Sequence, residues 1–489
     1  MDAWLQPLYD AEGIRAVDRW AIEEQGVPSA QLMETAGTTL AEAVAGLSPQ
    51  GPLRVVCGKG NNGGDGEIAG RRLAGMGFEV AVVQIFGDDV PGDFDAWLAG
   101  SGAVVDAIFG TGFAGEPREP VAAAIEAINR CGAPVVACDI ASGVDASSGE
   151  IAGMAVEADL TVSFHAAKLG HRIAPGKWHC GELRVVPIGI PAGAPAQPAG
   201  ATIDPAVLAL APHRGPCSTK FSSGQVTIAG GSRGLTGAVR MSSTAAIRAG
   251  AGYALVAVPS DLEPVFEAGQ PEVMSVGCPG GDGCLVPASA KAVLGAFERV
   301  AAGVLGPGLG RDPGTVELVR RVALEIGAPL VIDADGLNAF AGELERLAER
   351  RAATILTPHA GELGRLLGRD PEQIAAHRLA AAREAAEAAG AVVVLKGDDT
   401  IVTDGRRVAV NALAAPGLAT AGSGDVLSGI TAALLARGLE PFAAACAAVL
   451  AHARAGRDAA RRIGSAESVI ATDVIDSIPV GLLPGEPVD

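Results

Sequence analysis

The sequence predicts an α/β protein of two domains, each built on a mainly parallel sheet with helices on both sides. The chain has 489 residues, which is longer than one ordinary hydrophobic core allows. Its composition, with 49% hydrophobic, 3% aromatic and 19% charged residues, is typical of Ala/Gly/Val-rich α/β proteins. Apolar runs of strand length also alternate with helical patterns in both halves of the chain.

The first half contains six apolar runs of strand length. They lie at residues 53–57, 79–86, 103–110, 134–140, 159–164 and 182–190. Helical patterns such as residues 67–77 and 121–132 separate these runs. Strands that are apolar on both faces and separated by helices predict a parallel sheet covered on each side, a three-layer α/β/α arrangement.

A stretch rich in Pro and Ala, residues 191–205, interrupts this pattern and is the predicted linker. The alternation of strands and helices then restarts. Further strand-like runs lie at residues 225–230, 253–259, 300–308, 328–336, 353–359, 391–397 and 400–405. We therefore expect one domain over residues 1–205 and a second over residues 206–489.

Net charge and local composition exclude some classes of binding partner and indicate where in the cell the protein is located. The 37 basic and 56 acidic residues give a formal net charge of −19, which argues against binding to nucleic acid or to an anionic membrane. No window reaches the ~18 unbroken apolar residues of a membrane span, and the N-terminus lacks the pattern of a targeting peptide. The eight cysteines are scattered and are interpreted as reduced thiols. We expect a cytoplasmic homo-oligomer.

A glycine-rich segment follows the first strand of the first half. In VVCGKGNNGGDG, Gly58, Gly60 and Gly63 form a G-x-G-x-x-G pattern, which allows a tight turn and the close approach of a phosphate group. An NAD-binding domain of this kind would place an acid at the end of the next strand to hold the ribose, and Gln84 is found there instead. The loop therefore predicts a ligand with phosphate groups, but not ordinary dinucleotide binding.

Polar residues gather at the predicted carboxyl ends of the following strands, where open α/β sheets bind ligands. They are Asn61, Asn62, Asp65, Asp106, Asp139, Ser142 and Lys168. Three acids beside one crevice need a cation, a proton or solvent between them, and Lys168 adds a positive charge to the same rim. The alternative is that each acid only caps a helix.

The motifs GKGNNGGDG, LMETAG, DAIFGTGF, DIASGVD and KLGHRIAPG, in this order, resemble the NAD(P)H-hydrate epimerase family over about residues 10–200. The resemblance implies that the hydrated nicotinamide nucleotide binds Asn61, Asn62, Gly63, Gly64, Asp65, Gly110, Thr111, Gly112, Phe113, Ala114, Gly115, Glu116 and Asp139. It implies that a potassium ion binds Asn62, Asp106 and Ser142. We expect Asp139 to be the acid/base residue at C6 of the hydrated ring.

The second half carries its candidate chemistry on several strand ends. The motifs lie at residues 306–311, 331–338, 356–368, 394–400 and 416–430, and no Walker-type phosphate loop is present. In the last motif, Asp425 follows a small-residue turn, Gly422 to Gly424, whose amides favour an anion. Asp425 is either a helix N-cap or a base, and His359 is either a cap or a ligand contact.

These motifs resemble the ADP- or ATP-dependent NAD(P)H-hydrate dehydratases, which have a ribokinase-like fold, over about residues 215–480. The resemblance implies that the adenine nucleotide binds Lys396, Gly397, Asp398, Asp399, Thr400 and Gly424. It implies that the hydrate contacts Gly308, His359 and Asp425. Asp425, ionised at its ordinary pKa, is then the base for the C6 hydroxyl, while the amides of Gly422 to Gly424 hold the transferred phosphate.

Together the two resemblances predict a Rossmann-like epimerase domain followed by a ribokinase-like dehydratase domain. The predicted partners are hydrated NADH or NADPH and an adenine nucleotide, with ADP preferred over ATP, Mg²⁺ as its companion ion, and AMP and phosphate as products. The alternative from the second half alone is a kinase for a small alcohol, because this fold accepts many such substrates. A nucleotide sensor with decayed sites is a further alternative.

Overall fold

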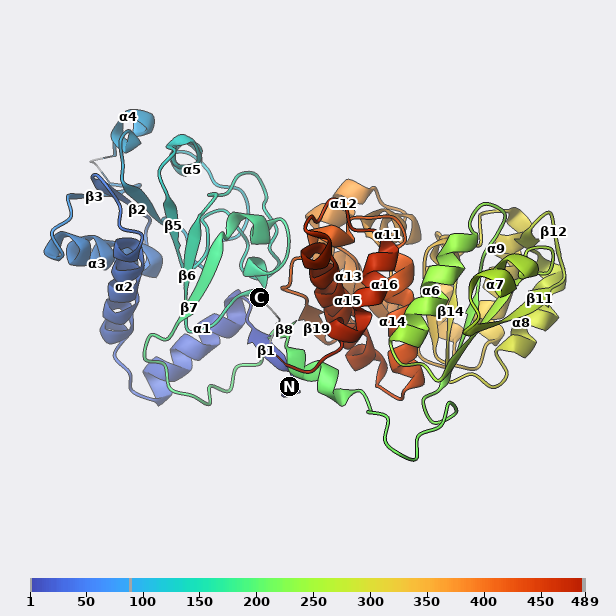
Figure 1. Ribbon diagram of the computed structural model, residues 1–489. Helices are drawn as coiled ribbons and strands as arrows, with labels where there is room; N and C mark the ends of the chain where they lie inside the picture. Colours follow the sequence, from blue (N-terminus) through green and yellow to red (C-terminus); the bar gives the residue numbers. More distant parts are fainter. Residues whose placement is uncertain (1, 88–89, 486–489) are drawn as a thin grey trace. The chain divides into compact units, whose positions relative to one another are not determined.

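The computed structural model describes residues 2–87 and 90–485. They form two compact units, Pro7–Ala201 and a larger unit of Met1–Gln6 with Thr202–Asp489. In Figure 1 the first unit runs from blue to green, and the part of the larger unit from residue 202 onward runs from green to red. The structure thus differs from the expected division after residue 205, because both the start of the chain and residues 202–205 belong to the larger unit.

The sheet of the first unit has six parallel strands in the order β3-β2-β4-β5-β6-β7. Their bounds are β2 Leu53–Cys57, β3 Val80–Gln84, β4 Ala103–Ala107, β5 Val135–Cys138, β6 Leu160–Phe164 and β7 Glu182–Val186. All six predicted strands are confirmed. The chain runs outward from β2 to β3 and then back to β4, so the crevice at the carboxyl ends of β2 and β4 is the switch point where such sheets bind ligands.

Helices cover both faces of this sheet, as predicted. Residues of α2 (Ser29–Gly46) and α3 (Asn61–Gly75) share one buried apolar cluster with the strands, and those of α5 (Val121–Arg130) share another with the opposite face (Figure 1). The remaining helices are α1 (Ala11–Arg19) and α4 (Phe94–Leu98).

The glycines that follow β2, up to the first turn of α3, are required by close packing or by a left-handed backbone. A Cβ atom on Gly58 would lie 1.9 Å from the Ile108 carbonyl oxygen, and one on Gly63 would lie 1.9 Å from the Gly58 carbonyl oxygen. Gly60 adopts φ +106°, which side chains rarely tolerate. The G-x-G-x-x-G pattern therefore brings the start of α3 directly against the loop after β4.

The larger unit is built on an eleven-stranded sheet in the order β1-β8-β19-β18-β17-β16-β15-β14-β9-β10-β11. The predicted strands are confirmed as β9 Gln225–Ala229, β10 Tyr253–Pro259, β14 Ala302–Leu305, β15 Leu330–Ile332, β16 Thr354–Leu356, β17 Val392–Leu395 and β18 Ile401–Thr403. The unpredicted strands of this sheet are β1 Leu5–Leu8, β8 Gly200–Ile203, β11 Val273–Cys278 and β19 Val408–Val410. A separate hairpin joins β12 Gly280–Gly281 to β13 Cys284–Leu285.

One expectation about this sheet needs correction. The segment 191–205 is not only a linker, because β8 within it pairs with the sheet. The pairings from β11 to β17 are parallel, as expected, and β18 runs antiparallel to both β17 and β19. Short strands such as β8 and β19 carry too few residues for a clear pattern, and their partners in the sheet determine that they form.

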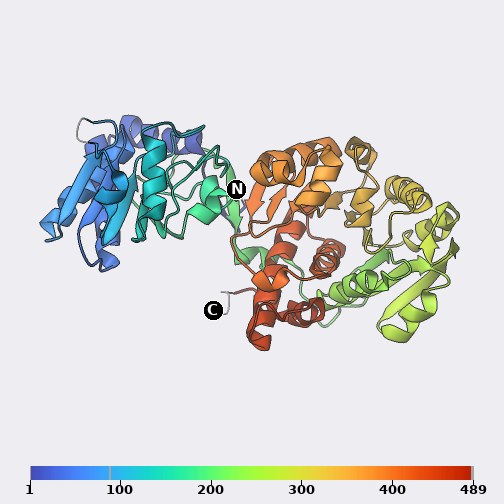
Figure 2. The same ribbon diagram turned by 90° about the horizontal axis from the view of Figure 1, so that it is seen from above.

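Four helices of the larger unit form one packed group. The helices α6 (Thr236–Arg248), α14 (Ser423–Ala436), α15 (Pro441–Ile463) and α16 (Ala471–Gly481) pack on one another, and Figure 2 shows the red helices together. The others are α7 Glu263–Gly269, α8 Ala290–Ala296, α9 Pro313–Glu325, α10 Asp335–Asn338, α11 Ala360–Leu367, α12 Pro371–Ala376 and α13 Arg378–Ala389. Within the described residues, none of the helices has the length and apolar character needed to cross a bilayer.

Candidate active sites

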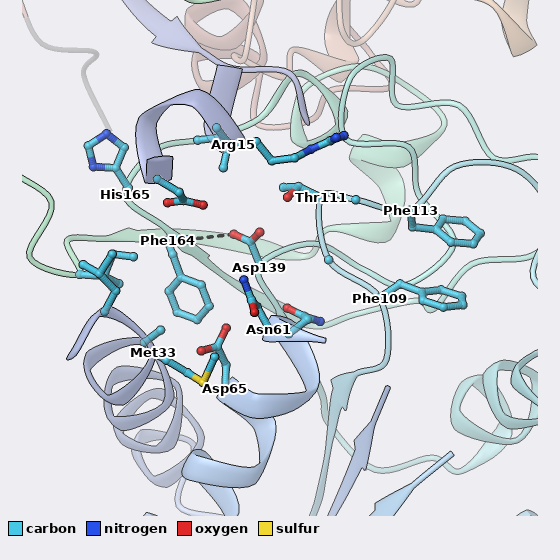
Figure 3. Close-up of a pocket in the computed structure, with 18 of the residues that line it drawn as sticks. Arg15, Met33, Asn61, Asp65, Phe109, Thr111, Phe113, Asp139, Phe164 and His165 are labelled. Carbon is cyan, nitrogen blue, oxygen red and sulfur yellow. Dashed lines mark hydrogen bonds between the residues drawn. The ribbon is translucent and has the colours of Figure 1, made fainter. Parts of the chain in front are cut away.

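The first unit holds a cavity of about 690 Å³ at the carboxyl ends of its strands (Figure 3). Nine predicted residues line it: Asn61, Asn62, Asp65, Gly110, Thr111, Gly112, Phe113, Ala114 and Asp139. Four predicted substrate contacts, Gly63, Gly64, Gly115 and Glu116, are not among the lining residues. Gly63 instead packs against Gly58, as described above, so its role in the structure is to admit the turn.

Asp139 follows β5 and faces the cavity (Figure 3). Its carboxylate accepts a hydrogen bond from the Phe164 amide at 3.1 Å and forms an ion pair with Lys168. Its backbone adopts φ +67°, a left-handed conformation that is costly for a side-chain-bearing residue and that concentrates at functional sites. The strained turn and the two donors fix the direction of this carboxylate.

Lys168 was expected on the rim of the crevice, but it is completely buried. Its ammonium group also donates to the Ser163 hydroxyl at 2.8 Å and to the Phe164 carbonyl at 3.2 Å. A buried ammonium is tolerated only when it is paired and hydrogen-bonded, and here all its donors are used. Lys168 therefore borders the cavity as a buried group, and it holds the carboxylate of Asp139 in place.

His171 supports the same turn as a neutral ring. Its Nδ1 accepts a hydrogen bond from the Lys168 amide at 3.1 Å, so Nε2 carries the proton and donates to the Asp139 carbonyl at 2.9 Å. Burial, with the charge of Lys168, lowers the pKa of His171 to about 3. The ring thus stays uncharged at neutral pH and serves as a fixed strut.

Two further carboxyl groups border this cavity, Asp65 on α3 and Asp18 on α1. Burial, followed by the negative charges of Asp139 and Asp18, raises the pKa of Asp65 to about 8. Burial and Asp139 also raise the pKa of Asp18. At neutral pH, Asp65 is therefore mainly protonated.

The predicted potassium ligands Asp106 and Ser142 lie buried behind the cavity rather than on its wall. The Ser142 hydroxyl donates to Asp106 at 2.6 Å, and its amide donates to the other carboxylate oxygen at 2.8 Å. Burial raises the pKa of Asp106 to about 6, although these hydrogen bonds oppose the rise. The side-chain nitrogen of Asn62 is buried without a hydrogen-bond partner.

Other cavity residues were not found from the sequence. Arg15, Asp18 and Lys59 bring charges to the cavity, and Phe109 stacks on Phe113 with ring centroids 4.3 Å apart. Arg15 and Asp18 lie on the first helix, far from any glycine-rich motif, so only the folded chain brings them to the cavity. The pattern of charged and apolar residues in that helix is that of an ordinary amphipathic helix, so it did not indicate a binding site.

The larger unit holds a separate cavity of about 490 Å³ next to the end of β17. The predicted nucleotide residues Lys396, Gly397, Asp398, Thr400 and Gly424 line it. Its other walls are mainly apolar, with Leu413, Leu427 and Val449 among them, beside the polar Asn411 and His452. An apolar slot with few polar groups and one lysine suits a purine base joined to phosphates.

Asp399 differs from its predicted neighbours, because it does not line this cavity. It is buried, and its carboxylate pairs with Arg378 through contacts of 2.8 and 2.9 Å. Arg378 also donates to the Lys396 carbonyl at 3.3 Å. Asp399 thus shapes the backbone of the loop rather than facing a ligand.

Lys396 lies between two carboxylates that sequence reasoning did not select as site residues. Its ammonium group is 3.1 Å from Asp333 and 3.5 Å from Glu362. The Ser428 hydroxyl donates to the second oxygen of Asp333 at 2.5 Å. Burial alone would lower the pKa of Lys396, but the charges of Asp333 and Glu362 raise it, so the lysine is cationic.

Asp425 is the third residue of α14, and the N-cap of that helix is Gly422. The alternative that Asp425 caps the helix is therefore wrong. Burial, followed by the charge of Asp333, raises the pKa of Asp425 to about 7. This corrects the expectation of a carboxylate at its ordinary pKa, since Asp425 is close to half protonated at neutral pH.

The three predicted hydrate contacts, Gly308, His359 and Asp425, lie outside the residues that line this cavity. His359 caps α11, because its Nδ1 accepts from the Gly361 amide at 3.0 Å and from the Glu362 amide at 3.3 Å. Its side chain is 54% exposed, so the ring can still meet a ligand through Nε2. Gly308 adopts φ +62° and a Cβ there would lie 2.4 Å from the Leu235 carbonyl, so this turn requires glycine.

Two protein-family models match the chain, one within each of its two units. A family model described as NAD(P)H-hydrate dehydratase matches residues 226–480. A second model, described as YjeF-related protein N-terminus, matches residues 29–99 and 85–170.

Full-length relatives match both units at once. The bifunctional NAD(P)H-hydrate repair enzyme Nnr of Salinibacter ruber is 38% identical, with 98% of this chain and 96% of the relative covered. The enzyme of the same name from Moorella thermoacetica is 37% identical over 96% of each chain. A Bacillus subtilis ADP/ATP-dependent NAD(P)H-hydrate dehydratase, co-crystallised with ATP and Mg²⁺, is 26% identical, with 56% of this chain and 94% of that chain covered and a TM-score of 0.49. From the full-length matches, the chain belongs to the family of bifunctional NAD(P)H-hydrate repair enzymes.

Proposed function

We propose that the chain returns hydrated NADH and NADPH to their active forms in two steps. The first unit interconverts the R and S forms of the hydrate. The larger unit dehydrates the S form with ADP, or ATP, as co-substrate. The observation that carries this proposal is that each unit has its own cavity, bordered by Asp139 in one and by Lys396 and Gly424 in the other.

In the first step, Asp139 acts as an acid/base group toward the oxygen carried by the hydrated C6 of the nicotinamide ring. Lys168 and the Phe164 amide hold its carboxylate at the cavity wall, so the group needs little reorganisation during the reaction. The stacked Phe109 and Phe113 offer an aromatic surface to the base or the ring of the substrate. Arg15 and Lys59 supply positive charge for its phosphates.

Asn62, Asp106 and Ser142 are the residues that would hold a potassium ion. Their amide, carboxylate and hydroxyl groups offer hard oxygen ligands, which suit such an ion. Asp106 is a buried carboxylate without a cation partner among the described residues, so its charge is not balanced by a neighbouring side chain. The group therefore fits, and a bound cation would supply the positive charge that lowers the pKa of Asp106.

In the second step, the nucleotide phosphates meet Lys396 and the amides of the first turn of α14, which have no partner within the helix. Asp425 takes the proton of the C6 hydroxyl as its oxygen attacks the terminal phosphorus, and AMP leaves when ADP is the donor. The C6–O bond then breaks with phosphate as the leaving group, C5 loses a proton to solvent, and the C5–C6 double bond of the ring is restored.

Magnesium would bind through the nucleotide phosphates with one or two carboxylates, as Mg²⁺ usually does. Asp333 and Glu362 fit this requirement because both point at Lys396, which borders the nucleotide cavity. When bound, the ion would neutralise charge on the phosphates during transfer. The cytoplasmic location and the homo-oligomeric state stay predictions that cell fractionation and sedimentation of the purified chain can test.

The test is to incubate the purified chain with mixed R and S hydrates and either ADP or ATP, and to follow the return of near-ultraviolet dihydronicotinamide absorbance. We expect recovery of both forms. No recovery with either nucleotide would contradict the dehydratase assignment, and recovery of the S portion alone would contradict the epimerase assignment.

A further inference from the structure

The first cavity contains one carboxyl group that the proposed chemistry leaves unused. Asp65 lies in the second turn of α3, is only 8% exposed and borders the cavity beside Asp139 (Figure 3). Among the described residues, no hydrogen-bond donor and no cation contacts its carboxyl, whereas Asp139 has the Phe164 amide and Lys168. The two carboxyls on one cavity thus have opposite surroundings.

Inversion at C6 needs both an acid and a base. The C6 hydroxyl is a poor leaving group until it gains a proton, and the incoming water must lose one. Two carboxyls whose surroundings favour different protonation states can divide these roles. Hydrogen-bond donors on its oxygens stabilise the ionised form of Asp139, which suits a base. No donor contacts the carboxyl of Asp65 among the described residues, which favours its protonated form and suits an acid.

We propose that Asp65 is the general acid of the epimerisation and Asp139 its base. Asp65 gives its proton to the C6 oxygen, the C6–O bond breaks with release of water, and the ring nitrogen lone pair forms a C6–N1 double bond. Water then adds to C6 from the other face and gives a proton to Asp139. The reverse reaction, or exchange with solvent, returns both groups to their starting states. This inference rests on the proposed epimerase function.

The packing of α3 supports the assignment. A Cβ on Gly66 would lie 2.5 Å from the Ala107 side chain, and a Cβ on Gly37 of α2 would lie 2.7 Å from the Asp65 carbonyl. The helix is therefore locked between the sheet and α2, and the position of Asp65 is fixed relative to Asp139. A catalytic acid has to be held in a fixed position relative to the atom that it protonates.

The first test uses the full chain with nucleotide omitted, so that only R and S interconversion is measured, by chromatography. We expect Asp65→Asn to lower kcat by about 10² to 10⁴-fold, the usual worth of general acid catalysis, with KM changed by less than about threefold. Glu67→Gln is the matched control, because Glu67 is exposed on the same helix and bonds to Gln84. It should keep the parent kcat.

The dependence of kcat on pH distinguishes a catalytic acid from a residue that only supports the fold. The pKa of Asp65 is raised to about 8, so the parent kcat should fall above that pH, and this fall should be absent in Asp65→Asn. The charged or titratable groups that face Asp65 are Asp18, Asp139, Lys168, His165 and Cys138. The pKa of His165 is lowered by burial and that of Cys138 is raised by burial, so neither should cause the fall.

The outcomes are distinct. The inference is overturned if Asp65→Asn keeps the parent kcat, if it changes only KM, or if Asp18→Asn rather than Asp65→Asn removes the alkaline fall. If Asp65→Asn does not fold, Asp65→Glu replaces it and should show reduced kcat with the alkaline fall retained. A parent chain that dehydrates the S hydrate but never interconverts the two forms would instead refute the proposed epimerase function.

Discussion

At the scale of a single residue, the surroundings of Asp425 determine how readily its carboxyl group ionises. It lies in a helix turn whose amides favour an anion, yet burial and the neighbouring carboxylates disfavour its own charge. Its pKa of about 7 makes it a base whose strength is matched to neutral pH, rather than a carboxylate that is always ionised.

We expect Asp425→Asn to lower dehydratase turnover on the S hydrate by about 10² to 10⁴-fold, because the attacking hydroxyl loses its base. In the parent chain, turnover should rise about tenfold per pH unit below a pKa of about 7 and level off above it, since only the ionised form accepts the proton. Initial rates at saturating ADP measure both. Asp476→Asn, at an exposed acid on α16, is the control, and a parent profile that is flat across this range would contradict the role.

The same substitution should stabilise the fold. An unfolded Asp has a pKa of about 3.9, and the folded value is about 7, so between these values the folded state binds the extra proton and stability falls as the pH rises. The neutral Asn avoids this loss. By calorimetry, Asp425→Asn should melt above the parent at about pH 8, with a smaller difference at about pH 5. An equal difference at both pH values would show that charge is not the cause.

At the scale of elements, the contact between α2 and α3 positions the epimerase cavity. Gly37 lies where the helices touch: a Cβ there would be 2.5 Å from the Ile68 Cβ and 2.7 Å from the Asp65 carbonyl oxygen. The two helices can approach this closely only because the position lacks a side chain. Neither helix pattern in the sequence shows which glycine makes the contact.

We expect Gly37→Ala to destabilise the first unit by about 1–3 kcal/mol, the usual cost of overpacking, and to slow epimerisation by moving α3. Gly46→Ala is the matched control on the same helix, because a Cβ there meets nothing within 4 Å. It should be neutral or stabilise by about 0.4–1 kcal/mol. Denaturant unfolding of the full chain measures both. If the two variants unfold alike, the close contact is not what positions α3.

At the scale of the whole molecule, two compact units each carry a cavity, so the S hydrate has to pass from one site to the other. The proposed pathway needs only that the first unit supplies the form that the larger unit consumes. Because the hydrate is a small molecule, release into solvent is sufficient for this transfer.

We therefore expect two single-site variants to complement each other in a mixture. Asp139→Asn should recover only the S portion of a hydrate mixture, and Asp425→Asn should recover neither form. An equimolar mixture of the two proteins should recover both forms, with the R portion delayed. Absorbance measurements with ADP present provide the test. Recovery of the S portion alone by the mixture would show that the hydrate is not released between the sites.

The sequence by itself determined the order of strands and helices, the glycine turns and the polar residues at strand ends. These features depend on period, turn chemistry and position after a strand, all of which are local to a stretch of chain. Asn61, Asp65 and Asp139 were predicted in this way and line one cavity, and Lys396 and Gly424 line the other.

Only the tertiary structure decided which of these groups carry charge and which face a ligand. Lys168 is buried under Asp139, Asp399 is neutralised by Arg378, and Ser428 reaches Asp333 across 95 residues of sequence. It also decided that β8 joins a sheet and that Asp65 and Asp425 have raised pKa values. The physical reason is that desolvation, ion pairing and strand pairing depend on neighbours in space, which the order of residues does not list.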